Sequence, residues 1–312
     1  MPSNQTDSQV LVILGATAVG KTETAIRVAE RVGGEIISAD SRLLYRGMDI
    51  GTAKPSLDER RRVKHHLIDL ADPDEIWSLA LFQKELLHKI HEISDTGRLP
   101  IVTGGTGQYI RSLVEGWVIP TVKPDHQLRA VLESWGLEIG SEELHKKLSV
   151  LDAEAARKID PQNLRRLVRA LEVIFSSGKP FSSQKERAEQ PLEFKLIGLT
   201  RSRPELYERV DARIEQMFAS GFEDEVRALI SKGYSPELPT LSAIGYREVI
   251  QVIRGKSTHE EAKQTMRRKT REFIRRQANW FKPDDPQIEW FEMTPDPLER
   301  IIRVVQGWRK GR

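Results

Sequence analysis

The chain has 312 residues, of which 38% are hydrophobic and 30% are charged, with a formal net charge of +3. That length predicts one large or two smaller domains, and so balanced a charge does not by itself indicate a nucleic-acid partner. The sequence contains no cysteine, which excludes disulfides, thiolate catalysis and cysteine zinc sites. The first nine residues are polar and no apolar run approaches about 18 residues, so we expect a cytoplasmic protein without a membrane span.

A glycine-rich loop lies between a predicted strand and a predicted helix near the start of the chain. The apolar run 10–14 is typical of a buried strand, and residues 23–31 have helical spacing. Between them, the pattern G-x-x-x-x-G-K-[ST] is matched by Gly15, Ala16, Thr17, Ala18, Val19, Gly20, Lys21 and Thr22. Curled backbone N–H groups, the start of the helix and the Lys21 ammonium would bind phosphate, and the Thr22 hydroxyl could hold Mg²⁺. The loop alone does not identify the reaction, since it suits any di- or triphosphate.

The second predicted strand, residues 35–40, ends in an acid, Asp40. In an open α/β sheet ligands bind beyond the carboxyl ends of the strands, so Asp40 would lie at the same rim as the phosphate loop. It is a candidate general base, but it also suits a turn cap or a Mg²⁺ ligand. The residues that follow it, through 55, form a polar loop.

Residues 67–70 are expected to form another strand, with Asp69 at its end. The preceding pair, His65 and His66, favours a structural role over metal binding, because no third ligand stands at a useful spacing. Residues 78–93 have the pattern of an amphipathic helix.

The strand 99–103 runs into a second glycine turn, residues 104–107, which contains Thr106 and opens a helix. Two glycine turns at the ends of two strands would face one ligand, although the second also suits a mere tight connection.

Residues 117–191 are rich in Leu, Glu, Arg and Lys and are predicted to form an inserted helical domain. Its expected helices are 127–134, 141–149, 153–158 and 163–175. Arg165 and Arg169 lie one turn apart, outside the apolar face of the last of these helices, where a solvated basic face is the alternative to a binding surface. The predicted fold is therefore α/β, with a parallel-sheet core of residues 1–116 and 192–312 that is flanked by helices.

Residues 193–200 return to a strand pattern, and 204–220 follow as a helix that carries Arg209 and Arg213. Their i, i+4 spacing places both guanidinium groups on one face, where they could grip a diphosphate or form surface salt bridges to Glu205 or Glu208.

The segment 266–282 carries Lys or Arg at seven positions and a single acid, Glu272. Arg267, Arg271 and Arg275 recur every four residues, and Phe273, Trp280 and Phe281 are interleaved with the basic residues. Such a stripe indicates a nucleic-acid backbone as partner, with a plain solvated face as the alternative.

Taken together, these blocks resemble the tRNA dimethylallyltransferases. The resemblance rests on GATAVGKT, SADSRLLYRGMDIGTAKP, HHLIDLADP, GGTGQYI, RLVRALEV, GFEDEVRAL, IGYREV and TRE-x₃-RQ-x₂-W, in the order that the family has them. It implies transfer of a dimethylallyl group from dimethylallyl diphosphate to the exocyclic amine of the adenosine beside the anticodon of tRNA. The zinc finger of the eukaryotic relatives is not expected here, since the sequence has no cysteine.

The resemblance also implies a role for individual residues. The loop 15–22 would hold the diphosphate, with Mg²⁺ on Thr22 and Asp40. Asp40 would be the general base, and Thr106 would lie near the leaving diphosphate. Arg213 would bind the diphosphate, with help from Arg209. The implied tRNA contacts are Asp40, Ser41, Arg42, Leu43, Thr106, Arg129, Arg165, Arg166, Arg169, Gly245, Tyr246, Arg247, Arg271, Arg275, Arg276, Gln277 and Trp280. Many members of the family have Gln where Leu43 stands.

Three other classes remain open on the residues alone. A nucleoside kinase would need only the first loop, an isopentenyltransferase acting on free AMP or ADP would need no RNA-binding helices, and an RNA-binding NTPase would need no prenyl donor. We expect a monomer that binds the anticodon stem-loop of tRNA and dimethylallyl diphosphate.

Overall fold

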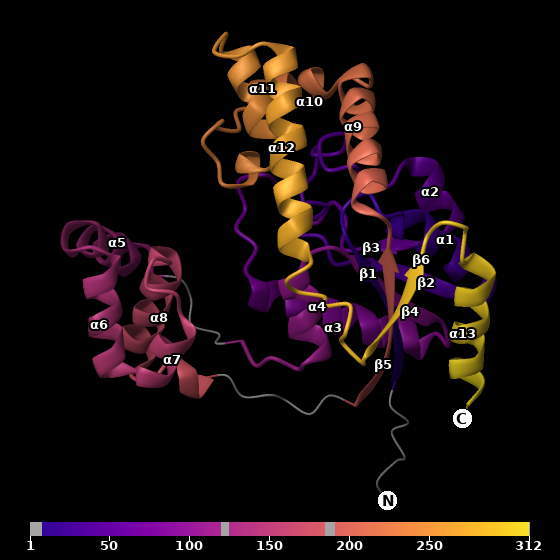
Figure 1. Ribbon diagram of the computed structural model, residues 1–312, viewed down its shortest axis with the longest axis horizontal. Coiled ribbons are helices and arrows are strands. Elements are labelled where there is room, and N and C mark those ends of the chain that lie inside the picture. The colour runs from indigo at the N-terminus through magenta and orange to yellow at the C-terminus, as the bar shows by residue number, and fades with distance from the viewer. Residues whose placement is uncertain (1–7, 120–124, 185–190, 312) are drawn as a thin grey trace, which may run out of the picture. The chain divides into compact units, whose positions relative to one another are not determined.

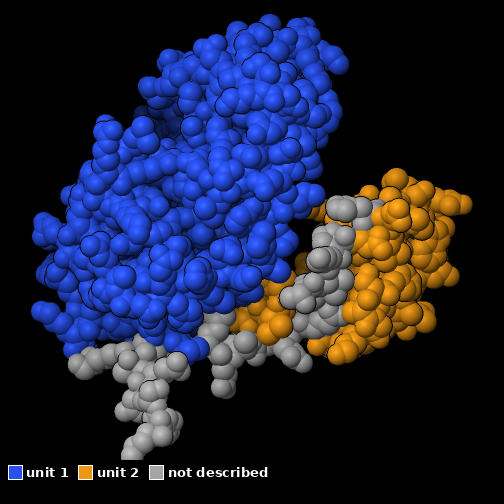
Figure 2. All heavy atoms as spheres, turned by 180° about the vertical axis from the view of Figure 1, so that it is seen from behind, with its two compact units in different colours: residues 1–114, 191–312 blue, residues 115–190 orange. Residues whose placement is uncertain are grey.

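The computed structural model describes residues 8–119, 125–184 and 191–311. The chain divides into two compact units, which Figure 2 colours separately: unit 1 comprises residues 1–114 and 191–312, and unit 2 comprises residues 115–190. Among the described residues, no helix combines the length and the apolar character that a membrane crossing requires.

Unit 1 is built on a six-stranded sheet in which every pair of neighbouring strands is parallel. The order is β3-β2-β4-β1-β5-β6, with β1 Ser8–Gly15, β2 Gly34–Ser38, β3 His65–His66, β4 Leu99–Gly104, β5 Leu192–Thr200 and β6 Ile288–Glu292. Residues 10–14 of β1 are fully buried, because helices cover both faces of a parallel sheet. The predicted α/β class is confirmed.

Helices flank this sheet in Figure 1. They are α1 Lys21–Val32, α2 Leu57–Arg62, α3 Leu79–Asp95, α4 Gly107–Val114, α9 Arg203–Ala219, α10 Phe222–Ser231, α11 Tyr246–Ile253, α12 His259–Gln277 and α13 Leu298–Lys310. Helix α13 packs on α1, and α12 packs between α9 and α11.

Unit 2 is the helical insertion. It contains α5 His126–Ile139, α6 Ser141–Leu151, α7 Ala153–Lys158 and α8 Leu164–Ser177. These helices enclose a small apolar core of their own, in which Leu144, Leu148 and Leu167 are fully buried. An independent core is what a separate domain requires.

Two segments differ from the sequence-based expectation. The strand predicted over 67–70 is wrong: β3 is only His65–His66, and Leu67 and Asp69 both have φ of 57°, a left-handed conformation that no strand contains. The edge strand β6 was not predicted; its burial alternates irregularly, and its only sheet neighbour among the described strands, β5, lies far away in the sequence.

Candidate active site

The loop after β1 curls through three positive φ angles: 148° at Gly15, 67° at Ala18 and 117° at Gly20. A Cβ on Gly15 would lie 2.6 Å from Leu199 O of the adjacent strand, so that position requires glycine. Ala18 is strained in this conformation, and Arg209 holds it there by donating from Nε to Ala18 O over 2.7 Å. Since the first N–H groups of α1 also have no partner within the helix, the loop has the form of an anion-binding nest.

Three cationic side chains gather at this nest. The Lys21 ammonium donates to Gly15 O over 3.1 Å and to Ala16 O over 2.8 Å. The pKa of Lys21 is lowered from 10.5 to about 8, chiefly by burial; the nearby Asp40 acts in the opposite direction, and Arg213 adds to the lowering. The charges of Asp40 and Arg213 therefore act on Lys21 within a single site.

Arg213 is the least compensated of these cations. It forms no ion pair with any carboxylate in the described part of the chain, and burial together with Arg209 lowers its pKa. The salt bridges to Glu205 or Glu208 that the sequence left open are likewise not found among the described residues. Half-buried positive charge without a partner is costly unless an anion supplies the missing charge, so this arrangement is suited to a phosphate group.

Asp40 follows β2 at the same edge of the sheet. Its Oδ1 accepts from Arg42 N over 2.9 Å, which fixes the start of the loop that runs to residue 55. The adjacent Ala39 donates from its backbone N to Thr103 O over 2.7 Å, and a Cβ on Gly104 would lie 2.4 Å from Ala39 O. The two backbones approach so closely that the second glycine turn, with Thr106, lies beside Asp40.

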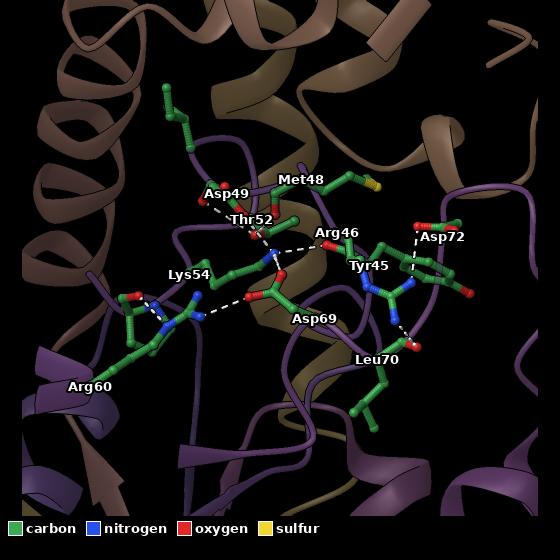
Figure 3. Close-up of polar contacts among 12 residues, drawn as sticks. Tyr45, Arg46, Met48, Asp49, Thr52, Lys54, Arg60, Asp69, Leu70 and Asp72 are labelled. Atoms are coloured by element: carbon green, nitrogen blue, oxygen red, sulfur yellow. Dashed lines mark hydrogen bonds and ion pairs between the residues drawn. The ribbon is translucent and has the colours of Figure 1, made fainter. Parts of the chain in front are cut away.

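A network of ion pairs around the buried Lys54 fixes the rest of the loop after Asp40 (Figure 3). The Lys54 side chain is only 1% exposed, and it donates to Asp49 over 2.5 Å, to Asp69 over 2.6 Å and to Tyr45 O over 2.8 Å. Arg60 binds the other oxygen of Asp69 over 2.7 Å. Burial tends to raise the pKa of Asp69, but the hydrogen bonds from Lys54 and Arg60 lower it overall, so this carboxylate stays charged between two cations.

A second carboxylate, Glu225 of α10, anchors the same loop from outside. It accepts backbone hydrogen bonds from Asp49, Ile50 and Gly51, over 2.9, 2.6 and 3.2 Å, and one from the Tyr246 hydroxyl over 2.6 Å. Sequence reasoning did not identify Lys54 or Glu225, although both stand within the family blocks GTAKP and GFEDEVRAL.

Helix α12 carries the predicted basic stripe, but half of that stripe packs against α9. Arg267 pairs with Glu215, and Arg271 pairs with Asp211 over 2.6 Å and lies over the Tyr207 ring at 4.9 Å. A groove on this face is lined by Gln264, Arg267, Arg268, Arg271 and Arg275. Arg275 and Arg276 are exposed, and Trp280 is 39% exposed, so the free part of the basic surface lies at the carboxyl end of the helix.

Two of the predicted RNA contacts, Tyr246 and Gln277, have buried side chains. Tyr246 is fully buried, with its hydroxyl bonded to Glu225, while the neighbouring Arg247 is exposed. Gln277 is 4% exposed, and both polar atoms of its amide form hydrogen bonds with the protein backbone. Its Oε1 accepts from Thr17 N and its Nε2 donates to Gly105 O, each over 2.9 Å. The positions of these two residues do not support direct contacts with RNA.

In unit 2, Arg129 and Arg169 converge on one carboxylate. Each lies 2.9 Å from Glu172, whose side chain is fully buried. Two guanidinium groups on a single carboxylate leave one positive charge in excess, and each remains about one third exposed. Arg165 and Arg166 of α8 are exposed.

The chain as a whole is similar to proteins of known kind. The family model of IPP transferase matches residues 43–284. A tRNA dimethylallyltransferase of Thermomicrobium roseum is 45% identical over 95% of this chain and 90% of its own length, and one of a Roseiflexus species is 46% identical over 96% and 98%.

Solved structures agree with these relatives. The tRNA isopentenylpyrophosphate transferase of Bacillus halodurans is similar with a TM-score of 0.71 and 38% identity over 96% of each chain. A eukaryotic dimethylallyltransferase acting on tRNA is similar with a TM-score of 0.82 and 25% identity, over 98% of this chain and 80% of that one. By sequence and by fold, this chain belongs to the IPP transferase family and is an enzyme of the tRNA dimethylallyltransferase type.

Proposed function

We propose that the loop 15–22 binds the diphosphate of dimethylallyl diphosphate and that the dimethylallyl group passes to the exocyclic amine of the adenosine beside the anticodon. The observation that carries this assignment is that Lys21, Arg209 and Arg213 gather at the nest. Arg213 has no carboxylate partner among the described residues, and Asp40 lies close enough to affect the pKa of Lys21. The cations fit the leaving group, and the carboxylate fits the proton that the amine must lose.

The reaction needs both kinds of group. The exocyclic amine shares its lone pair with the adenine ring, so it attacks weakly unless a base takes its proton as the C–N bond forms. Asp40 is the proposed base. As the allylic C–O bond breaks, its electrons pass to the diphosphate, and the Lys21 ammonium, the Arg213 guanidinium and the loop amides stabilise the growing negative charge. Thr106, on the turn beside Asp40, would contact the same diphosphate.

Mg²⁺ fits the residues at this site as a cofactor. The described residues contain no cluster of three His, Asp or Glu, which agrees with an ion that prefers one or two carboxylates together with substrate phosphates and water. Thr22 forms no side-chain hydrogen bond among the described residues, which leaves its hydroxyl available, and Asp40 offers carboxylate oxygen. When bound, the ion would neutralise charge on the leaving diphosphate.

The proposed RNA surface of unit 1 comprises the exposed carboxyl end of α12 with the residues that follow it, Arg247 of α11, and the loop after Asp40. Arg275, Arg276 and Arg247 supply charge for phosphates, and Trp280 supplies a face on which a base could stack. Ser41, Arg42 and Leu43 lie beside Asp40, where the target base must arrive after it leaves its stack. In unit 2, Arg129, Arg165, Arg166 and Arg169 are the proposed phosphate contacts.

The test supplies radiolabelled dimethylallyl diphosphate with either tRNA or AMP as acceptor. We expect label in tRNA, none in AMP, and none in a tRNA whose adenosine beside the anticodon is replaced by uridine, which has no exocyclic amine. Labelled AMP would place the chain among transferases for free nucleotides. Phosphate transfer from labelled ATP to tRNA or a nucleoside would instead indicate a kinase and would overturn the proposal.

A further inference from the structure

The last residue of α12, Gln277, connects the two glycine loops of the site. Its Oε1 accepts from the backbone N of Thr17 in the phosphate loop, and its Nε2 donates to the backbone O of Gly105 in the second turn, both over 2.9 Å. The side chain is 4% exposed. A single buried amide is therefore hydrogen-bonded at both ends to the two backbones that face the diphosphate.

The surrounding backbone is shaped to admit this amide. A Cβ on Gly105 would lie 2.4 Å from Gln277 Nε2 and 3.5 Å from Lys21 Nζ, so both the amide and the Lys21 ammonium lie close to the turn. Two residues further on, a Cβ on Gly107 would lie 2.1 Å from Trp280 Cγ. Arg111 of α4 also donates to Trp280 O, over 3.0 Å. The end of α12 and the residues just after it are thereby fixed to the turn and to α4.

We propose that Gln277 is a positioning residue for the transfer reaction: its amide sets the spacing between the phosphate loop and the Gly104–Gly107 turn. This inference rests on the proposed function, because it concerns the diphosphate held between the two loops. The bond to Thr17 N fixes the orientation of that peptide, and the bond to Gly105 O fixes the turn that carries Thr106. In the described part of the chain, no backbone hydrogen bond joins residues 16–20 directly to residues 105–107.

The energetic effect of losing this amide is local. Removing the amide leaves the partly buried Thr17 N–H and the buried Gly105 C=O without these partners, and each loop can then reorient. Misplacement of reacting groups by about 1 Å can cost on the order of 10² in rate. Affinity for RNA depends on the exposed face of α12, which the Gln277 side chain does not reach.

The experiment compares Gln277→Met with the matched variant Gln83→Met. Gln83 is also a buried glutamine, and its amide donates to Ser112 O over 3.0 Å between α3 and α4. Both changes remove a buried amide and keep the length of the side chain. Three quantities are measured on folded protein: kcat with saturating donor and tRNA, the Kd for tRNA, and the Kd for inorganic pyrophosphate by calorimetry.

For Gln277→Met we expect kcat to fall by about tenfold to a hundredfold. Pyrophosphate binding should weaken by about fivefold, the equivalent of one hydrogen bond, while the Kd for tRNA stays within about twofold of the unmodified protein. Gln83→Met should lose thermal stability and change none of the three. An unchanged kcat and pyrophosphate affinity would overturn the inference, as would equal losses in both variants. A loss confined to tRNA affinity would return Gln277 to the RNA contacts.

The pyrophosphate measurement needs no turnover. If the unmodified protein transferred no dimethylallyl group, the proposed function would fail, whereas the effect of Gln277 on the two loops would still be decided by the pyrophosphate Kd.

Discussion

Binding of the donor should weaken as the pH rises through about 8. In the unliganded site, burial lowers the pKa of Lys21 from 10.5 to about 8. The charged fraction of this side chain then falls from about nine tenths at pH 7 to about one tenth at pH 9. A terminal phosphate with its last pKa near 6 keeps its charge over that range. If the ammonium is needed to hold the diphosphate, the Kd for dimethylallyl diphosphate should rise about tenfold between pH 7 and pH 9.

The assay is calorimetric titration of dimethylallyl diphosphate at constant ionic strength, at pH 7, 8 and 9. Lys21→Arg is the control, because a guanidinium keeps its charge throughout this range although it fits the loop less well. Its Kd should be higher at pH 7 and nearly independent of pH. A flat profile in the unmodified protein would refute the reasoning, and so would the same slope in the arginine variant, since the titrating group would then be another one.

Three further outcomes are expected. Arg213→Ala should weaken donor binding and turnover without altering tRNA affinity, and Arg213→Lys should recover only part of the loss, since an ammonium cannot donate in a bidentate fork; wild-type kinetics in the alanine variant would remove Arg213 from the site. Asp40→Asn should slow the single-turnover transfer by about 10²–10⁴ with both substrates still bound, and a loss of tenfold or less would leave Asp40 only a positioning or metal-orienting role. Arg275→Gln should reduce the slope of log K against log salt for tRNA by about one. Arg271→Gln removes the nearer ion-pair partner of Asp211 and should lower the Tm more than it changes that slope.

The sequence by itself determined the features that arise from neighbouring residues. The phosphate loop is one such feature, because its glycines, its lysine and the start of its helix are contiguous, and the curled backbone follows from their local preferences. The helices of unit 2 were predicted to within a few residues for the same reason, since helical periodicity is read within one or two turns. The position of Asp40 at the phosphate-loop edge followed from the rule that parallel strands share a carboxyl edge.

Only the tertiary structure decided which charged and polar groups are free. The repeat of basic residues along α12 suggests that Arg271 contacts RNA, but in the fold Arg271 is paired with Asp211 of α9, sixty residues earlier. Gln277 and Tyr246 stand in motifs that suggest RNA contacts, yet burial directs them toward Thr17, Gly105 and Glu225. Residues 67–70 have a strand-like composition, but they turn to bring Asp69 to Lys54 and Arg60. In each case the deciding partner lies outside the local motif, at least nine residues away in the sequence, so the folded chain must bring it into contact, and its charge or hydrogen bond then outweighs the local pattern.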